Sequence, residues 1–240
     1  MSDNIYNAPE AELLDEVKQG EYGSMEIALS GRYNFQIKSI LSEAWEKTKG
    51  SKRYILVGLL LYIVIYMAIS VLGAMMFGNG VLGGFVIPMI GVLASFPIIM
   101  GAFIVAIRKS MGVDSGFDAL FNLYSKVAKI FGLYIVMSLL ILLGFICLVL
   151  PGIYLSVAYL MAMPLLVEKN MGIWEALETS RKSITKRWFK HFGFLLLTSL
   201  IALIAMLPLG IGLIWAAPML MIAYAVLYRN MFGVDSKTLS

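Results

Sequence analysis

The run Tyr54-Ile55-Leu56-Val57-Gly58-Leu59-Leu60-Leu61 opens a stretch, Tyr54 to Ile107, that contains no Asp, Glu, Lys, Arg or His. A membrane-spanning helix needs about 20 apolar residues to cross roughly 30 Å of hydrocarbon. The stretch therefore has room for two such helices. Phe77-Gly78-Asn79-Gly80 lies between them, and glycine permits the tight turn that a hairpin needs.

Two further stretches without these residues follow, Ile130 to Val167 and Phe192 to Tyr228. Leu150-Pro151-Gly152 and Pro208-Leu209-Gly210-Ile211-Gly212 predict their turns, with Pro151, Gly152, Pro208 and Gly210 as the turn residues. The arms of these two hairpins have only about 16 to 20 residues, which is near the lower limit for spanning. Full crossing is the preferred interpretation, and a shallow re-entrant hairpin is the alternative.

The composition agrees, because 60% hydrophobic against 14% charged residues lies outside the range of soluble domains. We expect an all-α integral membrane protein with six transmembrane helices in three hairpins. Lys and Arg occur only between these stretches and outside them, never in a hairpin turn. The positive-inside rule then places both termini and all basic clusters in the cytoplasm. The N-terminus has acidic residues and no basic region before an apolar run, so we expect no cleavable signal peptide.

Each hairpin is preceded by a short segment that we expect to form an interfacial amphipathic helix, and it is followed by an exit segment. The recurrence of this unit predicts a threefold internal repeat within a single membrane domain, residues 36–233, with units of about 36–112, 113–172 and 173–233. Residues 234–240 form a short cytoplasmic tail. The lead-ins are Ile40 to Trp45, Phe117 to Phe121 and Ile173 to Leu177; the exits are Lys109-Ser110-Met111-Gly112, Lys169-Asn170-Met171-Gly172 and Arg229-Asn230-Met231-Phe232-Gly233.

The third lead-in predicts an amphipathic helix lying in the membrane interface. Ile173, Leu177 and Ile184 fall on one side of a 3.6-residue period, and Glu175, Glu178 and a row of lysines on the other. Basic residues near a membrane surface attract anionic lipid headgroups, and Trp favours the interface. The alternative is that these charges only fix the topology. The candidate headgroup contacts are Arg181, Lys182, Lys186, Arg187, Trp188 and Lys190.

Residues 1–35 carry seven acidic and two basic residues, without a sustained apolar period. We expect a flexible acidic cytoplasmic arm that folds back over the basic face.

The stretches contain no arrangement typical of catalysis, and we expect no enzyme, no cofactor and no metal site. His191 is the single histidine, and Cys147 is a lone cysteine inside a predicted helix. Prolines that break helices expose carbonyls in some transporters, and Pro88, Pro97, Pro164 and Pro218 are the candidates here.

Two resemblances add to this. Ile5 to Leu13 resembles a leader found before the first span of uncharacterised bacterial membrane proteins. Leu150-Pro151-Gly152-Ile153-Tyr154, Glu175-Ala176-Leu177, Ser180, Gly210-Ile211-Gly212 and Tyr228-Arg229 resemble the membrane domain of some glycerophosphodiester phosphodiesterases and related stand-alone proteins of the bacterial inner membrane. That resemblance covers roughly residues 117–233 and implies an all-helical inner-membrane domain. The catalytic domain of those enzymes is absent.

The expected function is that of a non-enzymatic inner-membrane protein with an accessory or membrane-organising role. Its expected partners are anionic membrane lipids, and a partner membrane protein or further copies of the chain, but not nucleic acid. The alternative is an oligomeric channel or transporter for a small solute or lipid. No ionisable residue lies inside the predicted helices, which argues against ion-coupled transport.

Overall fold

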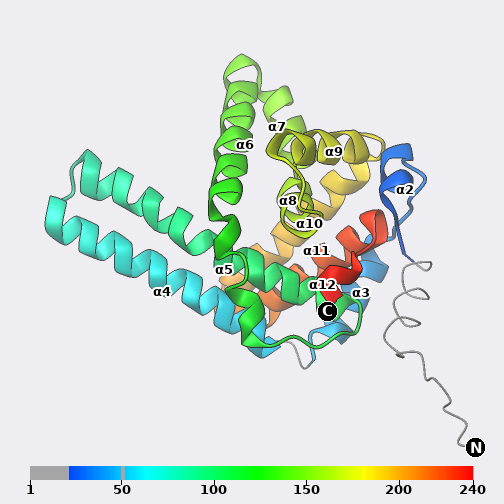
Figure 1. The fold of residues 1–240 in the computed structure, drawn as a ribbon, viewed down its shortest axis with the longest axis horizontal. Coiled ribbons are helices and arrows are strands. Elements are labelled where there is room, and N and C mark those ends of the chain that lie inside the picture. The colour runs from blue at the N-terminus through cyan, green and yellow to red at the C-terminus, as the bar shows by residue number, and fades with distance from the viewer. Residues whose placement is uncertain (1–21, 50–51, 240) are drawn as a thin grey trace, which may run out of the picture.

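The computed structural model describes residues 22–49 and 52–239, and every regular element among them is a helix (Figure 1). In chain order these are α2 (Met25–Ser30), α3 (Ile37–Lys47), α4 (Lys52–Phe77), the π-helix η1 (Leu82–Val86), α5 (Ile87–Ser110), the 3-10 helices η2 (Phe117–Leu120) and η3 (Tyr124–Lys126), α6 (Val127–Cys147), α7 (Val149–Ala158), α8 (Ala162–Glu168), α9 (Ile173–Thr185), α10 (Trp188–Met206), α11 (Leu213–Phe232) and α12 (Ser236–Leu239).

Six helical segments of this fold are long and apolar enough to cross a membrane. They form hairpin 1 (α4 and η1–α5), hairpin 2 (α6 and α7–α8) and hairpin 3 (α10 and α11). The all-helical fold with six apolar helices that the sequence predicts is therefore confirmed.

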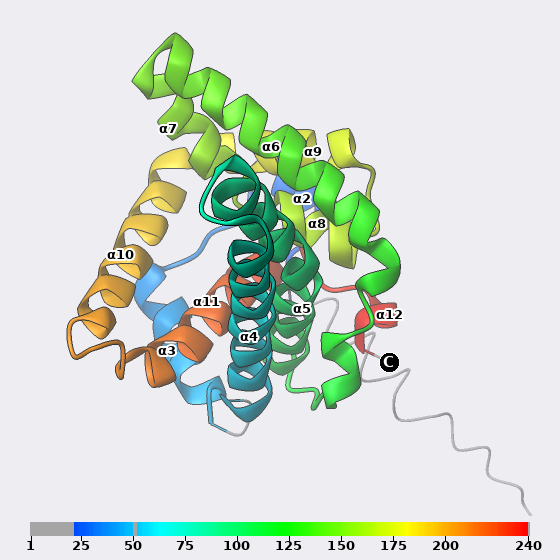
Figure 2. The ribbon, with the colours of Figure 1, turned by 90° about the vertical axis from the view of Figure 1, so that its left-hand side faces the viewer.

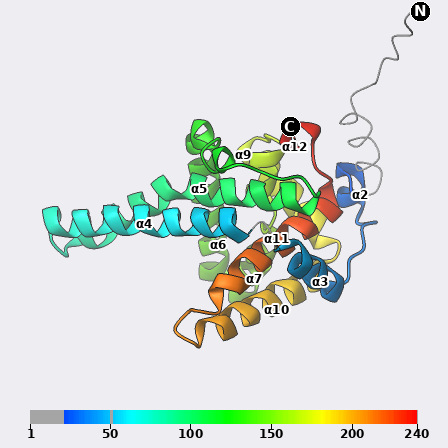
Figure 3. The same cartoon turned by 90° about the horizontal axis from the view of Figure 1, so that it is seen from below.

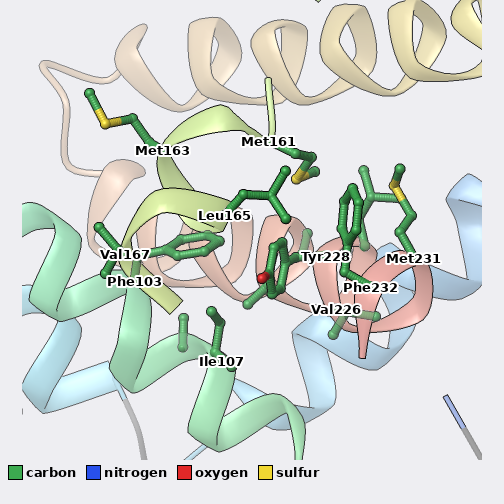
Figure 4. Close-up of a cluster of buried hydrophobic side chains, with 14 of the residues drawn as sticks. Phe103, Ile107, Met161, Met163, Leu165, Val167, Val226, Tyr228, Met231 and Phe232 are labelled. Carbon is green, nitrogen blue, oxygen red and sulfur yellow. The ribbon is translucent and has the colours of Figure 1, made fainter. Parts of the chain in front are cut away.

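The two arms of every hairpin differ in burial. In the apolar windows of α4, α6 and α10, which we call the outer arms, only 11%, 17% and 17% of the residues are buried. In the inner arms, η1–α5, α7–α8 and α11, the share is 56% each time. Figure 4 shows the core where three inner arms meet, with Phe103, Leu165 and Tyr228 labelled. The outer arms thus turn apolar side chains outward, where lipid is the medium that suits them.

Two of the three turns lie where the sequence predicts them. Gly78, after α4, has φ 67°, and Gly210, between α10 and α11, has φ 79°, both in the left-handed region that glycine tolerates. Hairpin 2 differs, because its arms are joined by the single extended residue Leu148. Pro151 and Gly152 instead lie in the first turn of α7, where a missing N–H costs no intrahelical bond.

The four prolines that the sequence predicts as helix breaks lie in different kinds of position. Pro97 and Pro218 lie inside α5 and α11, which continue through them, and Pro88 lies in the first turn of α5, directly after the π-helix. Pro164 alone among the four lies just after an interruption, the non-helical residues 159–161 between α7 and α8. A proline cannot donate to the carbonyl four residues earlier, and here the helix is interrupted at that point.

The hairpins diverge from a common base, formed by the C-terminal ends of the inner arms together with α2, α3 and α12. In Figure 1 hairpin 1 extends to the left while α6 runs to the top, and Figure 2 shows the turn of hairpin 3 far from that of hairpin 2. Hairpin 3 runs obliquely to hairpin 1 rather than alongside it (Figure 3). The Lys52 ammonium, at the start of α4, lies 4.3 Å from the ring centre of Trp215, near the turn of hairpin 3.

The described part of the expected flexible arm is packed, which corrects that prediction for residues 22–35. Ala28, Tyr33 and Phe35 are buried, and the Tyr33 hydroxyl donates to the carbonyl of Ser183 over 2.8 Å. The physical reason is that a few large aromatic side chains bury enough apolar surface without any regular period. Residues 1–21, which hold most of the acidic residues of the arm, lie outside the described part.

Candidate lipid-headgroup surface and the base of the bundle

Helix α9 uses its apolar side within the protein, although the sequence predicts that it faces the membrane. Leu177 and Ile184 are buried, and α9 packs against α6, α7 and α8. Its first turn is closed by Glu175, whose carboxylate accepts from the N–H of Gly172 over 3.1 Å. The surface that α9 leaves outside is therefore its charged side.

Ser180, on the buried side of α9, bridges the interruption of hairpin 2. Its hydroxyl donates to the carbonyl of Ala158 over 2.7 Å and accepts from the N–H of Met161 over 3.1 Å. Both backbone groups lack helical partners because the helix is interrupted between them. One buried hydroxyl thus joins the lead-in of hairpin 3 to the broken inner arm of hairpin 2.

Arg181, one of the predicted headgroup contacts, is held by its own helix. Its Nε and one terminal nitrogen donate to Glu178 over 2.9 and 2.7 Å, and the Lys182 ammonium lies 3.4 Å from the same carboxylate. These hydrogen bonds lower the pKa of Glu178 to about 2 and raise that of Arg181. Glu178 therefore neutralises part of the charge that the sequence assigns to lipid.

Three more of the predicted contacts bind neighbouring segments. Arg187 Nε donates to the carbonyl of Gly31 over 3.1 Å, and the Lys190 ammonium donates to the side-chain oxygen of Asn34 over 2.8 Å. Trp188 donates its indole N–H to the carbonyl of Tyr154 over 3.2 Å. Residues 31 and 34 of the arm make two of these contacts through a backbone carbonyl and an amide, and no acidic side chain of the described part of the arm does so. The fold-back of the acidic residues 1–21 stays a prediction.

Four side chains of this region remain exposed: Lys182 near the end of α9, Lys186 just after that helix, and Phe189 and Lys190 in the first turn of α10. Phe189 is 84% exposed, and Lys182 keeps 58% of its side chain accessible. We call these four residues the basic surface. Exposed ammonium groups together with an exposed aromatic ring are the combination that favours an anionic membrane interface.

The most buried charge in the described chain is at the base. Glu168 ends α8 with its side chain 0% exposed, and it accepts from the Tyr228 hydroxyl and the Asp235 N–H, each over 2.7 Å, and from the Thr238 hydroxyl over 3.2 Å. Arg108 Nε donates to the carbonyl of Thr238 over 2.6 Å. The segment around α12 is thereby fastened across the ends of all three inner arms.

A second buried group, Arg229, joins hairpins 1 and 3. It is 3% exposed and forms a two-point ion pair with Glu43 of α3, at 2.9 and 3.0 Å. It also donates to the carbonyl of Ser110, the last residue of α5, and lies 4.0 Å from the ring centre of Tyr22. A cation is favourable there, because the last carbonyls of a helix lack intrahelical donors and carry partial negative charge.

His191 is also buried, with Nδ1 3.0 Å from the carbonyl of Arg187 and Nε2 3.2 Å from the sulfur of Met231. The rings of Tyr33 and Phe35 contact it edge-on. Within residues 22–49 and 52–239, no three His, Cys, Asp or Glu side chains are grouped so that they could hold a metal ion.

Fold and surface together define an all-helical protein with six apolar helices, of the class of polytopic membrane proteins. No family profile, characterised protein or solved structure matches the chain.

Proposed function

We propose that this protein is a non-enzymatic, multi-pass protein of the bacterial inner membrane that binds anionic lipid headgroups on its cytoplasmic side, in an accessory or membrane-organising role. The supporting observation is the basic surface, where Lys182, Lys186 and Lys190 are exposed and the Phe189 side chain is 84% exposed. Each cation near an anionic surface contributes about 1 kcal/mol. An exposed aromatic ring adds apolar contact at the level of the headgroups.

The contact between the start of hairpin 1 and the turn region of hairpin 3 supports a particular position in the membrane. Lys52 begins hairpin 1 and contacts Trp215, which lies only three residues after Gly212 in the turn of hairpin 3. If hairpin 1 stands upright with Lys52 at the cytoplasmic interface, the turn of hairpin 3 lies near that interface too. This favours the shallow alternative for hairpin 3, with full crossing by hairpin 1.

Removing two outer lysines tests the proposal. The variant Lys182→Gln/Lys186→Gln is expected to weaken binding to phosphatidylglycerol nanodiscs by about 2 kcal/mol, or roughly 30-fold, at low salt. Binding is measured as phosphatidylglycerol retained against phosphatidylcholine in native mass spectra. Lys38 is an exposed lysine of α3, and the variant Lys38→Gln is the control for the loss of one charge. Retention that does not change in the double variant contradicts a headgroup role and leaves these lysines a topological role only.

Glu178 gives a test in the opposite direction. Glu178→Gln releases Arg181 and Lys182 from their carboxylate, and we expect about fivefold tighter retention of phosphatidylglycerol, since roughly one more cation becomes free for lipid. Glu46→Gln removes an exposed carboxylate on α3 and is the matched control.

Mild acid is not expected to mimic this variant. The pKa of Glu178 is lowered to about 2 from an ordinary value of 4.5, so its ion pair persists above pH 4.5 and is lost only as the pH falls towards 2. A rise in lipid retention of the wild type between pH 7 and pH 5 would contradict the role given to Glu178.

A further inference from the structure

A cavity of about 320 Å³ lies where the inner arms of all three hairpins meet, apart from the basic surface. Met100 and Phe103 of α5 form one wall, Leu160 and Met163 beside the interruption of hairpin 2 form the second, and α11 forms the third. None of the ten residues that line the cavity is charged. The only side-chain hydroxyl in the lining is that of Tyr224, and it lies 3.0 Å from the Thr198 hydroxyl.

The chemistry of this lining excludes most occupants. A polar solute would lose its hydration without finding charged or hydrogen-bonding partners, which is costly. Water needs two to four polar partners to be held in a cavity, and the Tyr224 hydroxyl is the only side-chain group of this lining that offers one. The occupant must therefore be apolar, and flexible enough to fit between three helices.

The surroundings identify that occupant. The rim residues Met100, Leu160, Leu220 and Met221 are only half-buried, so the cavity opens to the surface of the bundle. The outer arms around it expose apolar side chains, for which lipid chains are the medium. The four rim residues themselves belong to three of the six apolar helical segments, so in a membrane the opening faces lipid and a lipid chain can enter it without crossing water. Methionine side chains, four of the ten lining residues, adapt to flexible apolar ligands.

We infer that this cavity holds one acyl chain of a membrane lipid. At about 320 Å³ it is at the lower end of ligand pockets, which suits a single chain rather than a whole lipid. The inference rests on the proposed function, because it requires the bundle to be in a membrane, and it extends that function from headgroups to a second part of the lipid. The cavity would then bind a chain between the three hairpins.

A phospholipid that carries a diazirine on one acyl chain is the probe, reconstituted with the full chain in nanodiscs and cross-linked by light. Peptide mapping of the wild type is expected to find the label concentrated on Met100, Leu160, Met163, Leu220 and Met221. Labelling spread evenly along the exposed faces of α4, α6 and α10 would overturn the inference, and this result requires no variant.

Ala217 lines the cavity, and Ala217→Phe fills part of it. We expect about tenfold less label on the lining residues and one lipid fewer in native mass spectra, because the ring displaces roughly two methylene groups. Ala68→Phe, at an exposed position of α4, is the matched control and should change neither value. Equal labelling of the two variants would contradict the inference.

Helix content and thermal unfolding show whether Ala217→Phe is folded. The variant Lys182→Gln/Lys186→Gln separates the two proposals, since it should lose selectivity for phosphatidylglycerol but keep the label inside the cavity. If the double variant loses its selectivity for phosphatidylglycerol but the wild type shows no label on the lining of the cavity, only the acyl-chain site is contradicted.

Discussion

Glu168→Ala is expected to destabilise the folded protein by about 3 to 5 kcal/mol, the cost of removing one partner from a buried, hydrogen-bonded charge cluster. The carboxylate is 0% exposed and accepts from Tyr228, Asp235 and Thr238. Without it, the Tyr228 hydroxyl and the Asp235 N–H lose their acceptor, and the Lys169 ammonium, 3.4 Å away, loses one of its two carboxylate partners. For a chain of this length the midpoint of thermal unfolding in detergent should fall by about 10 °C.

The same substitution should also free the C-terminal segment. Asp235 keeps its 2.5 Å contact with Lys169, and Thr238 keeps Arg108, so we expect loosening of α12 rather than complete detachment. Limited digestion with carboxypeptidase measures this directly, with faster loss of the last residues in the variant. Glu26→Ala, which removes a partner from the exposed pair with Arg32, is the control and should leave the midpoint unchanged. An unchanged midpoint in Glu168→Ala would contradict the role of this cluster.

Most of the fold could be predicted from the sequence because its pattern is local. The three stretches without charges fix where helices can lie in an apolar medium, and glycine fixes the turns at Gly78 and Gly210. The turn of hairpin 2 was placed three residues too late, since Pro151 fits both a turn and the first turn of a helix. In that case the local pattern allows two structures.

The partners of the basic residues could not be predicted, because they come from distant parts of the chain. Arg187 and Lys190 bind Gly31 and Asn34, which lie 156 residues earlier in the sequence. A helical period shows which side of α9 is charged, but not which other segment covers it. Lys182 and Lys186, which are exposed and take no part in these two hydrogen bonds, therefore remain the best candidates of the predicted set.

The base was missed for a related reason, although a signal was present. Glu168 lies just outside the second charge-free stretch, and from that pattern a charged residue there is expected to lie at the surface rather than in the core. Arg108, Glu168 and Tyr228 directly precede the three exit segments, and all three lie under the segment around α12. Residues at the same position of three repeated units would meet in this way if the units were arranged around a shared axis. The threefold repeat itself stays a prediction.

Arg229→Met is expected to cost about 3 kcal/mol, the second largest effect. The substitution removes a 3% exposed guanidinium that binds Glu43 on α3 and the Ser110 carbonyl at the end of α5. Methionine keeps most of the side-chain volume, so the loss reports on the lost charge and hydrogen bonds rather than on a new cavity. Thermal unfolding in detergent measures the effect, and Lys38→Met, at an exposed position, is the control for loss of a cation.

A double-mutant cycle with Glu43→Gln shows how this cost arises. Glu43 keeps Lys47 at 3.6 Å and is 30% exposed, so water and a second cation partly stabilise it when Arg229 is lost. The double variant should therefore be destabilised by less than the sum of the two single variants, by about 1 to 3 kcal/mol, as expected for residues in direct contact. Strict additivity would mean that Arg229 stabilises the base through Ser110 and Tyr22 alone. A coupling of this size would show instead that the ion pair between α3 and α11 fastens the lead-in of hairpin 1 to hairpin 3, and so maintains the relative placement of the two hairpins on which the shallow position of hairpin 3 depends.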